Sequence, residues 1–526
     1  MLTPWRLAAL AMLAAAAWWR LGFLDLMLYD FDEGIASIYA LQLAEKWDFP
    51  LKGVKTSYEF YNPPFFIYLI SIPWLISRSP VFAVGFLQVL FLGALAILFR
   101  GLRRMGWSWG ALAVLALGGL GPGALLLTLR LWGCALIPTM SIIALLCALK
   151  LVRSPRDRAA SLILPLAVCA AQQAHFQGAL LAVSAGLALW IAGGRANARW
   201  LGAGVAAAAL SYLPYLFHLV QTHFSDLSVI VTLATQGGSA ARSPHDALWR
   251  SVWFSLSDFG GVTAFQQNYA RFLGGVACGA IYQYAGAAWL AASGIVAAAG
   301  LSMGFIRTGW RGRGGALSAT QQIAAVALAW TIVPLAVFGL LRVDVVPGYW
   351  LAAMPGPWLL AGALLEMIPD VSAVVRWRAR IAAPFLAAGL IGFFSACPFF
   401  YLRACFAVME RADPALLVYP TYRDQRDAVW FVCDDSSGKR VLLTQDARKP
   451  ETGVDYQLLY LIAMREGNAL RFTFQPDKPF QQPAAARYLL RTLSRPLPPE
   501  LLRELALWSQ RRFGLIRVYR QEPAEN

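Results

Sequence analysis

Charged residues are scarce in this chain. Only 14% of its 526 residues are Asp, Glu, Lys or Arg, whereas 58% are hydrophobic, and the mean hydropathy is +0.54. Soluble domains contain about 25% charged residues. The composition therefore excludes a soluble enzyme of this size and indicates a polytopic α-helical membrane protein.

Cysteine and histidine are also few, and their spacing points to no known kind of site. The seven cysteines are scattered, so they indicate neither a disulfide framework nor a zinc module, although one disulfide between Cys405 and Cys433 stays open. His218, His223 and His245 lack metal-ligand spacing. The chain has no internal repeat of solenoid or propeller length and no inverted repeat typical of transporters.

Long apolar stretches, by contrast, are abundant. A helix that crosses a hydrocarbon core of about 30 Å needs about 20 apolar residues, and about eleven stretches meet that requirement. They lie near residues 7–28, 81–99, 109–128, 131–150, 159–174, 178–193, 200–220, 283–306, 321–341, 349–367 and 381–402. We therefore predict a transmembrane domain over residues 1–403.

From residue 404 the composition becomes that of a soluble domain. Residues 404–526 predict an extracytoplasmic α/β domain, large enough to bury its own core. Apolar spacing predicts strands at 440–445, 469–474 and 515–519, and helices at 456–466, 484–492 and 500–511.

The net charge of +16 is distributed unevenly. Basic residues gather in alternate loops, for example Arg100, Arg103 and Arg104, whereas the intervening short connections hold little beyond Arg130 and Arg342. The positive-inside rule makes the Arg-rich loops cytoplasmic. We therefore expect a cytoplasmic N-terminus, an extracytoplasmic C-terminus, a bacterial inner-membrane location, and membrane lipids rather than nucleic acid as partners.

Two long outer loops follow from this topology, at 29–80 and 221–282. The first contains a short apolar segment after Pro63 and Pro64, interrupted by Pro73, which is typical of a helix lying in the membrane interface. The second is rich in aromatic and polar residues, and loops of that length usually serve a function. We expect it to fold over the same face as the first loop.

The first outer loop opens with three carboxylates in four positions, Asp30, Asp32 and Glu33. Asp32 could take the proton from an acceptor hydroxyl while Glu33 supports it, or the two could hold a divalent cation. Alternatively, Asp32 could cap the helix that runs to about Glu45. The two interpretations are compatible.

The loop also resembles a known family. Asp32-Glu33-Gly34, followed by Tyr61-Asn62-Pro63-Pro64 and then Tyr68, is similar to the first outer loop of GT-C glycosyltransferases, in particular the protein O-mannosyltransferases and lipid A aminoarabinose transferases. Gly348-Tyr349-Trp350-Leu351 with Pro355 resembles the family's late span. The resemblance implies a polyprenyl-phosphate sugar as donor, a loop acid as base and polyprenyl phosphate as leaving group, in an inverting reaction.

Some family positions differ in this chain. Asn62 stands where many members have lysine, Gln177 where the aminoarabinose branch has lysine, and Gly348 where the family has histidine. These differences argue against aminoarabinose as the sugar.

A departing phosphate needs a cation close by. Arg342 is the first candidate, with a lipid-anchoring role as the alternative, and Arg130 and Arg20 follow, Arg20 with an ion pair to Asp25 as its structural explanation. The other residues that we expect around the donor, each with a structural alternative, are Tyr349, Tyr58, Glu59, Asn62, Tyr68, His175 and Gln177.

The sequence thus predicts a membrane glycosyltransferase with a lipid, glycan or protein acceptor. A lipid-linked oligosaccharide ligase or polymerase shares the donor chemistry and stays open because of loop 221–282. A transporter or flippase would place its ionisable residues near the bilayer midplane. A scaffold without activity would tolerate changes of the loop acids.

Overall fold

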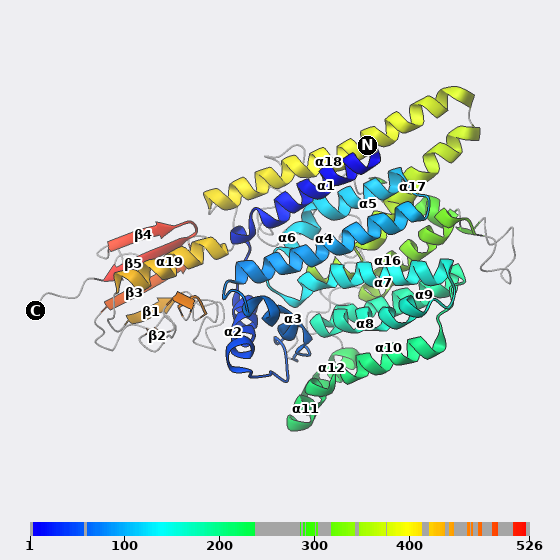
Figure 1. Cartoon of the computed structure of the whole chain (residues 1–526). Helices are drawn as coiled ribbons and strands as arrows, with labels where there is room; N and C mark the ends of the chain where they lie inside the picture. Colours follow the sequence, from blue (N-terminus) through cyan, green and yellow to red (C-terminus); the bar gives the residue numbers. More distant parts are fainter. Residues whose placement is uncertain are drawn as a thin grey trace, which may run out of the picture.

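The computed structural model describes most of the chain. The described residues are 4–56, 60–236, 317–341, 347–374, 376–412, 420–436 and 509–521, with shorter pieces between 285 and 302 and between 441 and 492. A bundle of helices occupies one end of the molecule and a small sheet the other (Figure 1). Two helices of the first outer loop, α2 and α3, lie where the bundle meets the sheet.

The bundle helices run mostly side by side. Their bounds are α1 (Pro4–Leu21), α4 (Pro80–Arg104), α5 (Trp109–Leu120), α6 (Pro122–Thr128), α7 (Ile137–Arg153), α8 (Arg158–Ala174), α9 (Leu180–Ala192), α10 (Ala198–Leu210), α11 (Leu213–Gln221), α12 (Ser225–Gln236), α16 (Ala319–Leu341), α17 (Pro355–Val374) and α18 (Arg376–Arg411). Three short 3-10 helices, η2 (Gly133–Leu136), η3 (Phe176–Ala179) and η5 (Pro347–Ala352), interrupt the connections.

Small residues let the bundle pack closely. A Cβ atom on Gly110 of α5 would lie 2.4 Å from the Gly362 carbonyl oxygen of α17, and one on Gly362 would lie 2.7 Å from that of Gly110. Such backbone contact between apolar helices is characteristic of membrane proteins, in which helix association depends on close packing.

Four helices of the described residues are long and apolar enough to cross a membrane: Pro80–Arg104, Gly133–Arg153, Ala319–Phe338 and Ala387–Arg411. Two bent pairs, α5 with α6 and α10 with α11, each turn by 43° at a break and raise the number to six. The protein is therefore an integral membrane protein, but these helices do not confirm eleven spans. Several expected spans are shorter or broken, such as α1, which ends at Leu21 and is followed by η1 (Leu24–Leu26).

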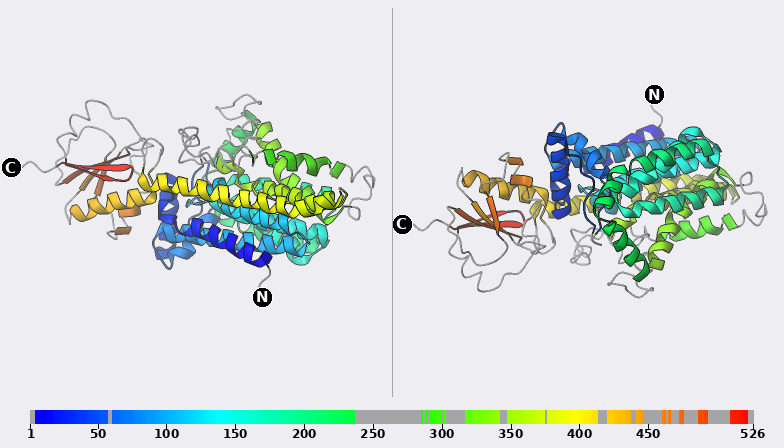
Figure 2. Two further views of the ribbon diagram at one scale, coloured as in Figure 1. Left: turned by 90° about the horizontal axis from the view of Figure 1, so that it is seen from above. Right: turned by 90° about the horizontal axis from the view of Figure 1, so that it is seen from below.

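The first outer loop contributes α2 (Phe31–Lys46) and α3 (Phe65–Trp74). The ten residues of α3 span about 15 Å at 1.5 Å per residue, half of a hydrocarbon core. Figure 2 shows α2 running across the end of the bundle, next to the sheet.

The tail forms one five-stranded sheet of order β2-β1-β3-β5-β4. Its strands are β1 (Val441–Gln445), β2 (Phe472–Gln475), β3 (Ala486–Thr492), β4 (Ser509–Phe513) and β5 (Ile516–Gln521). Strand β1 pairs in parallel with β2 and β3, whereas β5 pairs antiparallel with β3 and β4. The helix α19 (Tyr422–Asp435) packs against β4 and β5.

Two sequence predictions for the tail are wrong. We expect a helix over residues 484–492, but residues 486–492 of this range form β3, the central strand, in which Tyr488, Leu489 and Leu490 are all buried. A short continuous apolar run cannot be told from a buried helix by periodicity alone. The last residues of the predicted helix 500–511, from Ser509 on, belong to β4. Cys405 and Cys433 are both buried and are not joined by a disulfide.

The tail is attached to the segment that leads into α2. Tyr422 N donates to Met27 O at 2.8 Å, Gln425 Nε2 donates to Tyr29 O at 2.5 Å, and Arg423 pairs with Asp25 at 2.7 Å. The helix α19 therefore holds the chain directly before the acidic cluster.

Candidate functional site

The acidic cluster forms the first turn of α2. Asp30 is the N-cap residue in extended conformation, and Glu33 Oε2 accepts a hydrogen bond from Asp30 N at 3.1 Å, which completes a capping box. The expectation that Asp32 caps this helix is wrong, because the glutamate three residues after Asp30 makes Asp30 the better cap. Asp32 instead stands in the first turn, where a negative charge suits the helix dipole.

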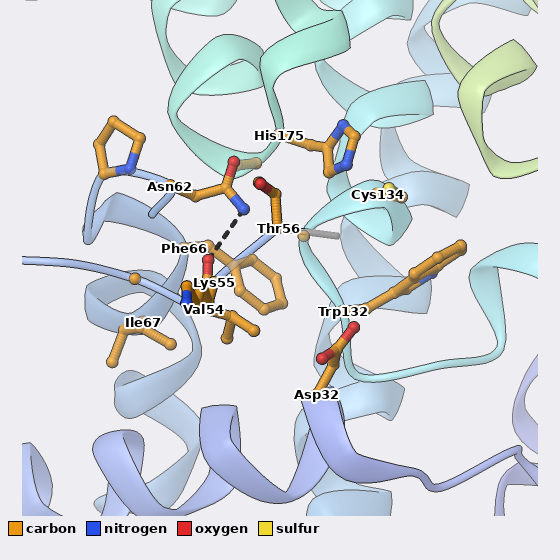
Figure 3. Close-up of a pocket in the computed structure, with 14 residues that line it drawn as sticks. Asp32, Val54, Lys55, Thr56, Asn62, Phe66, Ile67, Trp132, Cys134 and His175 are labelled. Carbon is orange, nitrogen blue, oxygen red and sulfur yellow. Dashed lines mark hydrogen bonds between the residues drawn. The ribbon is translucent and has the colours of Figure 1, made fainter. Parts of the chain in front are cut away.

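Asp32 lines a cavity of about 190 Å³ (Figure 3). The other walls come from the 53–56 segment, from Asn62 and Pro63, from α3, from 132–134, and from Ala174 and His175. Among the described residues that line it, Asp32 has the one carboxylate and Lys55 the one ammonium group. The residues that line the cavity thus include one acidic and one basic residue.

Glu33 has a different environment from Asp32. It is completely buried, and its Oε1 atom accepts from Arg130 Nε at 2.6 Å and lies 2.5 Å from Arg130 Nη2. Burial raises the pKa of the Glu33 carboxyl, and the Arg130 charge opposes that rise. Because one oxygen pairs with Arg130 and the other caps α2, Glu33 is placed to hold the first turn of the helix.

Arg130 extends this pair toward the cavity wall. Its guanidinium carbon lies 4.4 Å from the ring centroid of Trp132, which lines the cavity, and the indole donates to Leu127 O at 2.9 Å. Gly348 permits this packing, because a Cβ atom there would lie 2.6 Å from the Trp132 ring. The Trp132 ring therefore fills the space that a side chain at position 348 would need.

The wall opposite Asp32 is a small paired segment. Thr56 N donates to Phe60 O at 2.7 Å, Asn62 N donates to Val54 O at 3.1 Å, and Gly53 N donates to Asn62 O at 2.6 Å. A Cβ atom at Gly53 would lie 2.7 Å from Pro63 O, so only glycine fits. The Asn62 side chain donates to Val54 O, and its buried Oδ1 atom has no hydrogen-bond partner among the described residues.

Lys55 and Trp132 were not singled out by the sequence. The signal for Lys55 was its place in an outer loop of a chain whose outer connections have few basic residues. Trp132 gave no signal, because many tryptophans near helix ends only anchor a protein in the interface.

Asp226, at the start of α12, attaches the second outer loop to this segment. Its Oδ2 atom accepts from Tyr61 N at 3.1 Å and from the Tyr215 hydroxyl at 2.9 Å. The described beginning of that loop therefore contacts the first loop next to the cavity.

His175 lines the cavity between α8 and η3. Its Nδ1 atom accepts from Gln177 N at 3.5 Å, and its ring lies 4.3 Å from that of Phe176. Burial lowers the pKa of His175 to about 3, so the imidazole is neutral at physiological pH.

Two other expected donor residues lie outside the cavity lining. The Tyr68 hydroxyl donates to Pro50 O at 2.7 Å, and Gln177 Nε2 donates to Gly348 O at 3.0 Å. Arg342, Tyr58 and Glu59 fall outside the described residues, as does the side chain of Tyr349, whose backbone is part of η5.

Arg20 has a structural role, but the prediction that it pairs with Asp25 is wrong. It is completely buried, and its guanidinium donates to Gln88 Oε1 at 2.8 Å, to Thr128 Oγ1 at 2.9 Å and to two backbone carbonyls. Asp25 lies in η1, after the end of α1, and pairs with Arg423 instead.

No group of three or more His, Cys, Asp and Glu side chains that could hold a metal ion occurs within the described ranges. Of the two acids expected to bind a cation, Glu33 is paired with Arg130 and Asp32 lines the cavity.

Known structures share this fold. ArnT from Cupriavidus metallidurans bound to undecaprenyl phosphate superposes with a TM-score of 0.55 at 12% identity, over 97% of both chains, and its apo form gives 0.54. An oligosaccharyltransferase from Archaeoglobus fulgidus, in complex with Zn and sulfate, gives 0.51 at 14% identity, over 92% of this chain and 68% of that one. The sequence matches no protein-family model, and a search of curated proteins finds no match.

These similarities confirm the fold that the resemblance of the first outer loop predicts.

Proposed function

We propose that this protein is a membrane glycosyltransferase that moves a sugar from a polyprenyl-phosphate donor to an acceptor hydroxyl. The observation that carries the proposal is the Asp32 carboxylate at a cavity within a GT-C fold. ArnT, which has the same fold over its whole length, binds undecaprenyl phosphate. A donor of the same chemical class suits a cavity that combines an acid with the Lys55 ammonium group.

In the proposed reaction Asp32 accepts the proton of the acceptor hydroxyl as its oxygen attacks the anomeric carbon of the sugar. The bond from that carbon to the phosphate oxygen breaks, and polyprenyl phosphate leaves with the electron pair. Lys55 lies at the same cavity to balance the negative charge that develops on the phosphate. A single displacement of this kind inverts the anomeric configuration.

Glu33 acts in this scheme as a positioning residue. Its bonds to Arg130 and to the Asp30 amide hold the turn that carries Asp32. Asn62 Oδ1 is buried at the cavity and has no partner in the part of the chain that the structure describes, so it is suited to accept a hydrogen bond from a sugar hydroxyl. Tyr68 and Gln177 support the loops around the donor rather than contact it, and Arg342, Tyr349, Tyr58 and Glu59 stay proposed donor contacts.

The orientation is also part of the proposal. We place the N-terminus and the Arg-rich loops in the bacterial cytoplasm and the cavity outside, with eleven spans in a catalytic domain of residues 1–403 and α3 in the interface. The domain at 404–526 is then extracytoplasmic and lies close to the acceptor side.

The experiment is to incubate the purified protein with a panel of polyprenyl-phosphate sugars and measure the release of polyprenyl phosphate. We expect release with one donor, and loss of release in Asp32→Asn protein that inserts and folds normally. Parallel samples with a chelator assign any metal requirement. Transport of the lipid without release would instead support a flippase.

An oligosaccharide ligase is the second candidate, supported by the fold shared with the oligosaccharyltransferase. It predicts that lipid-linked oligosaccharides are better donors than single sugars. ArnT is matched over 97% of its length and the oligosaccharyltransferase over 68%, which favours the first proposal.

A further inference from the structure

A second cavity, of about 520 Å³, lies between the end of α1 and the last third of α18. It shares no lining residue with the cavity at Asp32. The proposed reaction uses none of its walls, which are Trp18, Trp19, Phe23, Phe399, Arg403, Phe406, Ala407 and Glu410.

Aromatic rings make up most of this second cavity. Trp19 stacks on Phe406 with centroids 5.4 Å apart and planes at 7°, and Phe23 stacks on Phe406 at 4.6 Å. Trp18, beside them, is 62% exposed. Tryptophans at the end of an apolar helix are typical of the depth at which lipid headgroups meet acyl chains.

One polar group in this aromatic wall lacks a partner. The Trp19 side chain is 3% exposed, and its indole N–H has no hydrogen-bond acceptor in the part of the chain that the structure describes. A buried donor without an acceptor is unfavourable. An ester or phosphate oxygen of a molecule in the cavity would supply one.

Arg403 and Glu410 give the cavity one charge of each sign. They lie seven residues apart on one face of α18, both are exposed, and neither forms an ion pair with another described residue. Seven residues are about two helical turns. The two positions are therefore about 10.5 Å apart along the helix axis, at 1.5 Å per residue. A zwitterionic headgroup between their long side chains would place its anion toward Arg403 and its cation toward Glu410.

We propose that this cavity binds a glycerophospholipid with a primary-amine headgroup, as in phosphatidylethanolamine. The phosphate pairs with Arg403, the ammonium group with Glu410, and an oxygen of the lipid accepts from Trp19. The aromatic wall contacts the glycerol and the first methylenes of the acyl chains. This proposal does not depend on the glycosyltransferase reaction.

Native mass spectrometry of the delipidated full-length protein tests it, with dioleoyl phosphatidylethanolamine and dioleoyl phosphatidylglycerol as probes at equal concentration. The wild type should retain one phosphatidylethanolamine with about tenfold preference. Arg403→Gln should weaken binding of both lipids, Glu410→Gln should remove the preference, and Trp19→Phe should weaken binding while keeping a ring in the wall. Arg411→Gln, an exposed neighbour on α18 outside the cavity lining, is the matched control and should bind as the wild type.

Three results would overturn the proposal. The first is equal retention of the two lipids by the wild type. The second is an Arg411→Gln variant that loses as much lipid as Arg403→Gln, since binding would then not depend on the cavity. The third is displacement of phosphatidylethanolamine by a lower concentration of undecaprenyl phosphate, which would assign the cavity to the prenyl lipid.

Discussion

At the scale of single residues, Asp32 and Glu33 are neighbours in sequence with opposite environments. Asp32 is exposed at a cavity, whereas Glu33 is buried against Arg130. The helix geometry explains this, because successive residues point about 100° apart around the axis. Of these two neighbouring acids, Asp32 can therefore reach a molecule in the cavity, whereas Glu33 holds the first turn of the helix.

Lys55 provides the first prediction. Lys55→Gln removes the ammonium group from the cavity lining and should lower kcat/KM for the donor by about tenfold or more, because one charge-assisted contact to phosphate is lost. Steady-state kinetics with the assigned donor measure this change. Lys52→Gln is the control, since Lys52 lies 3.8 Å from the Tyr61 ring and outside the cavity lining. An equal loss in both variants would contradict the role of Lys55.

The ion pair between Glu33 and Arg130 provides the second prediction. Glu33→Gln keeps a residue that can complete the capping box but breaks the ion pair, so it should reduce the free energy of unfolding by about 3 kcal/mol. Arg130→Gln should also destabilise the protein. The double variant should lose less free energy of unfolding than the sum of the losses in the two single variants. Denaturant unfolding of the purified protein in detergent measures all three. Additive losses would show that the two side chains do not interact.

The sequence identified Asp32 because a carboxylate after an apolar segment is costly without a use. It missed Lys55 and misassigned the partner of Arg20, since both depend on chain segments far apart in sequence. Arg20 meets Gln88 and Thr128, which lie 68 and 108 residues away. Spacing within one helix carries no information about such contacts.

At the scale of elements, α2 depends on the tail. Helix α19 donates from Tyr422 N and Gln425 Nε2 to the carbonyls of Met27 and Tyr29, directly before the N-cap of α2. This places the soluble domain in contact with the segment that orients Asp32. The sequence predicted a tail domain but gave no sign that it would contact the segment before the helix that carries Asp32.

The third prediction tests this support. Gln425→Ala should increase the hydrogen exchange of backbone amides in residues 27–33, because the Tyr29 carbonyl loses its donor and the segment opens more often. Mass spectrometry of deuterated peptides measures the rates. Arg465→Ala, which removes an exposed ion pair with Asp434 elsewhere in the tail, should leave these amides unchanged. Unchanged exchange in Gln425→Ala would contradict the coupling.

Strand β3 shows the limit of periodicity at this scale. Strand β3 lies between β1 and β5 in the sheet. Its consecutive residues Tyr488, Leu489 and Leu490 are all buried, so both faces of the strand are covered. The edge strand β4, by contrast, is exposed over its first four residues. A buried central strand therefore resembles a helix segment when only composition is available.

At the scale of the whole molecule, composition predicted the membrane class and the first outer loop predicted the fold. The number of membrane spans could not be read from the apolar stretches in the same way. Helix breaks such as those in α5–α6 and α10–α11 divide apolar stretches that hydropathy treats as continuous. Hydropathy measures only how apolar a stretch is. Whether a helix bends within that stretch depends on its packing against other helices.

The orientation gives the fourth prediction. Alkaline phosphatase, which is active only outside the cytoplasm, should be active when fused after Asn526 and inactive when fused after Arg158, in one of the Arg-rich loops. Enzyme activity in intact bacterial cells measures both fusions. The reverse pattern would place the cavity on the cytoplasmic side and contradict the proposed donor geometry.

The central claim is that Asp32 is the base of a polyprenyl-phosphate glycosyltransferase. The most direct measurement is the rate of polyprenyl phosphate release by wild-type, Asp32→Asn and Glu45→Gln proteins of equal thermal stability. Glu45 is the matched control, at the other end of α2, where it pairs with Arg78. We predict that Asp32→Asn lowers kcat by about 10²–10⁴-fold and that Glu45→Gln does not. A folded Asp32→Asn protein with the wild-type rate would contradict the account.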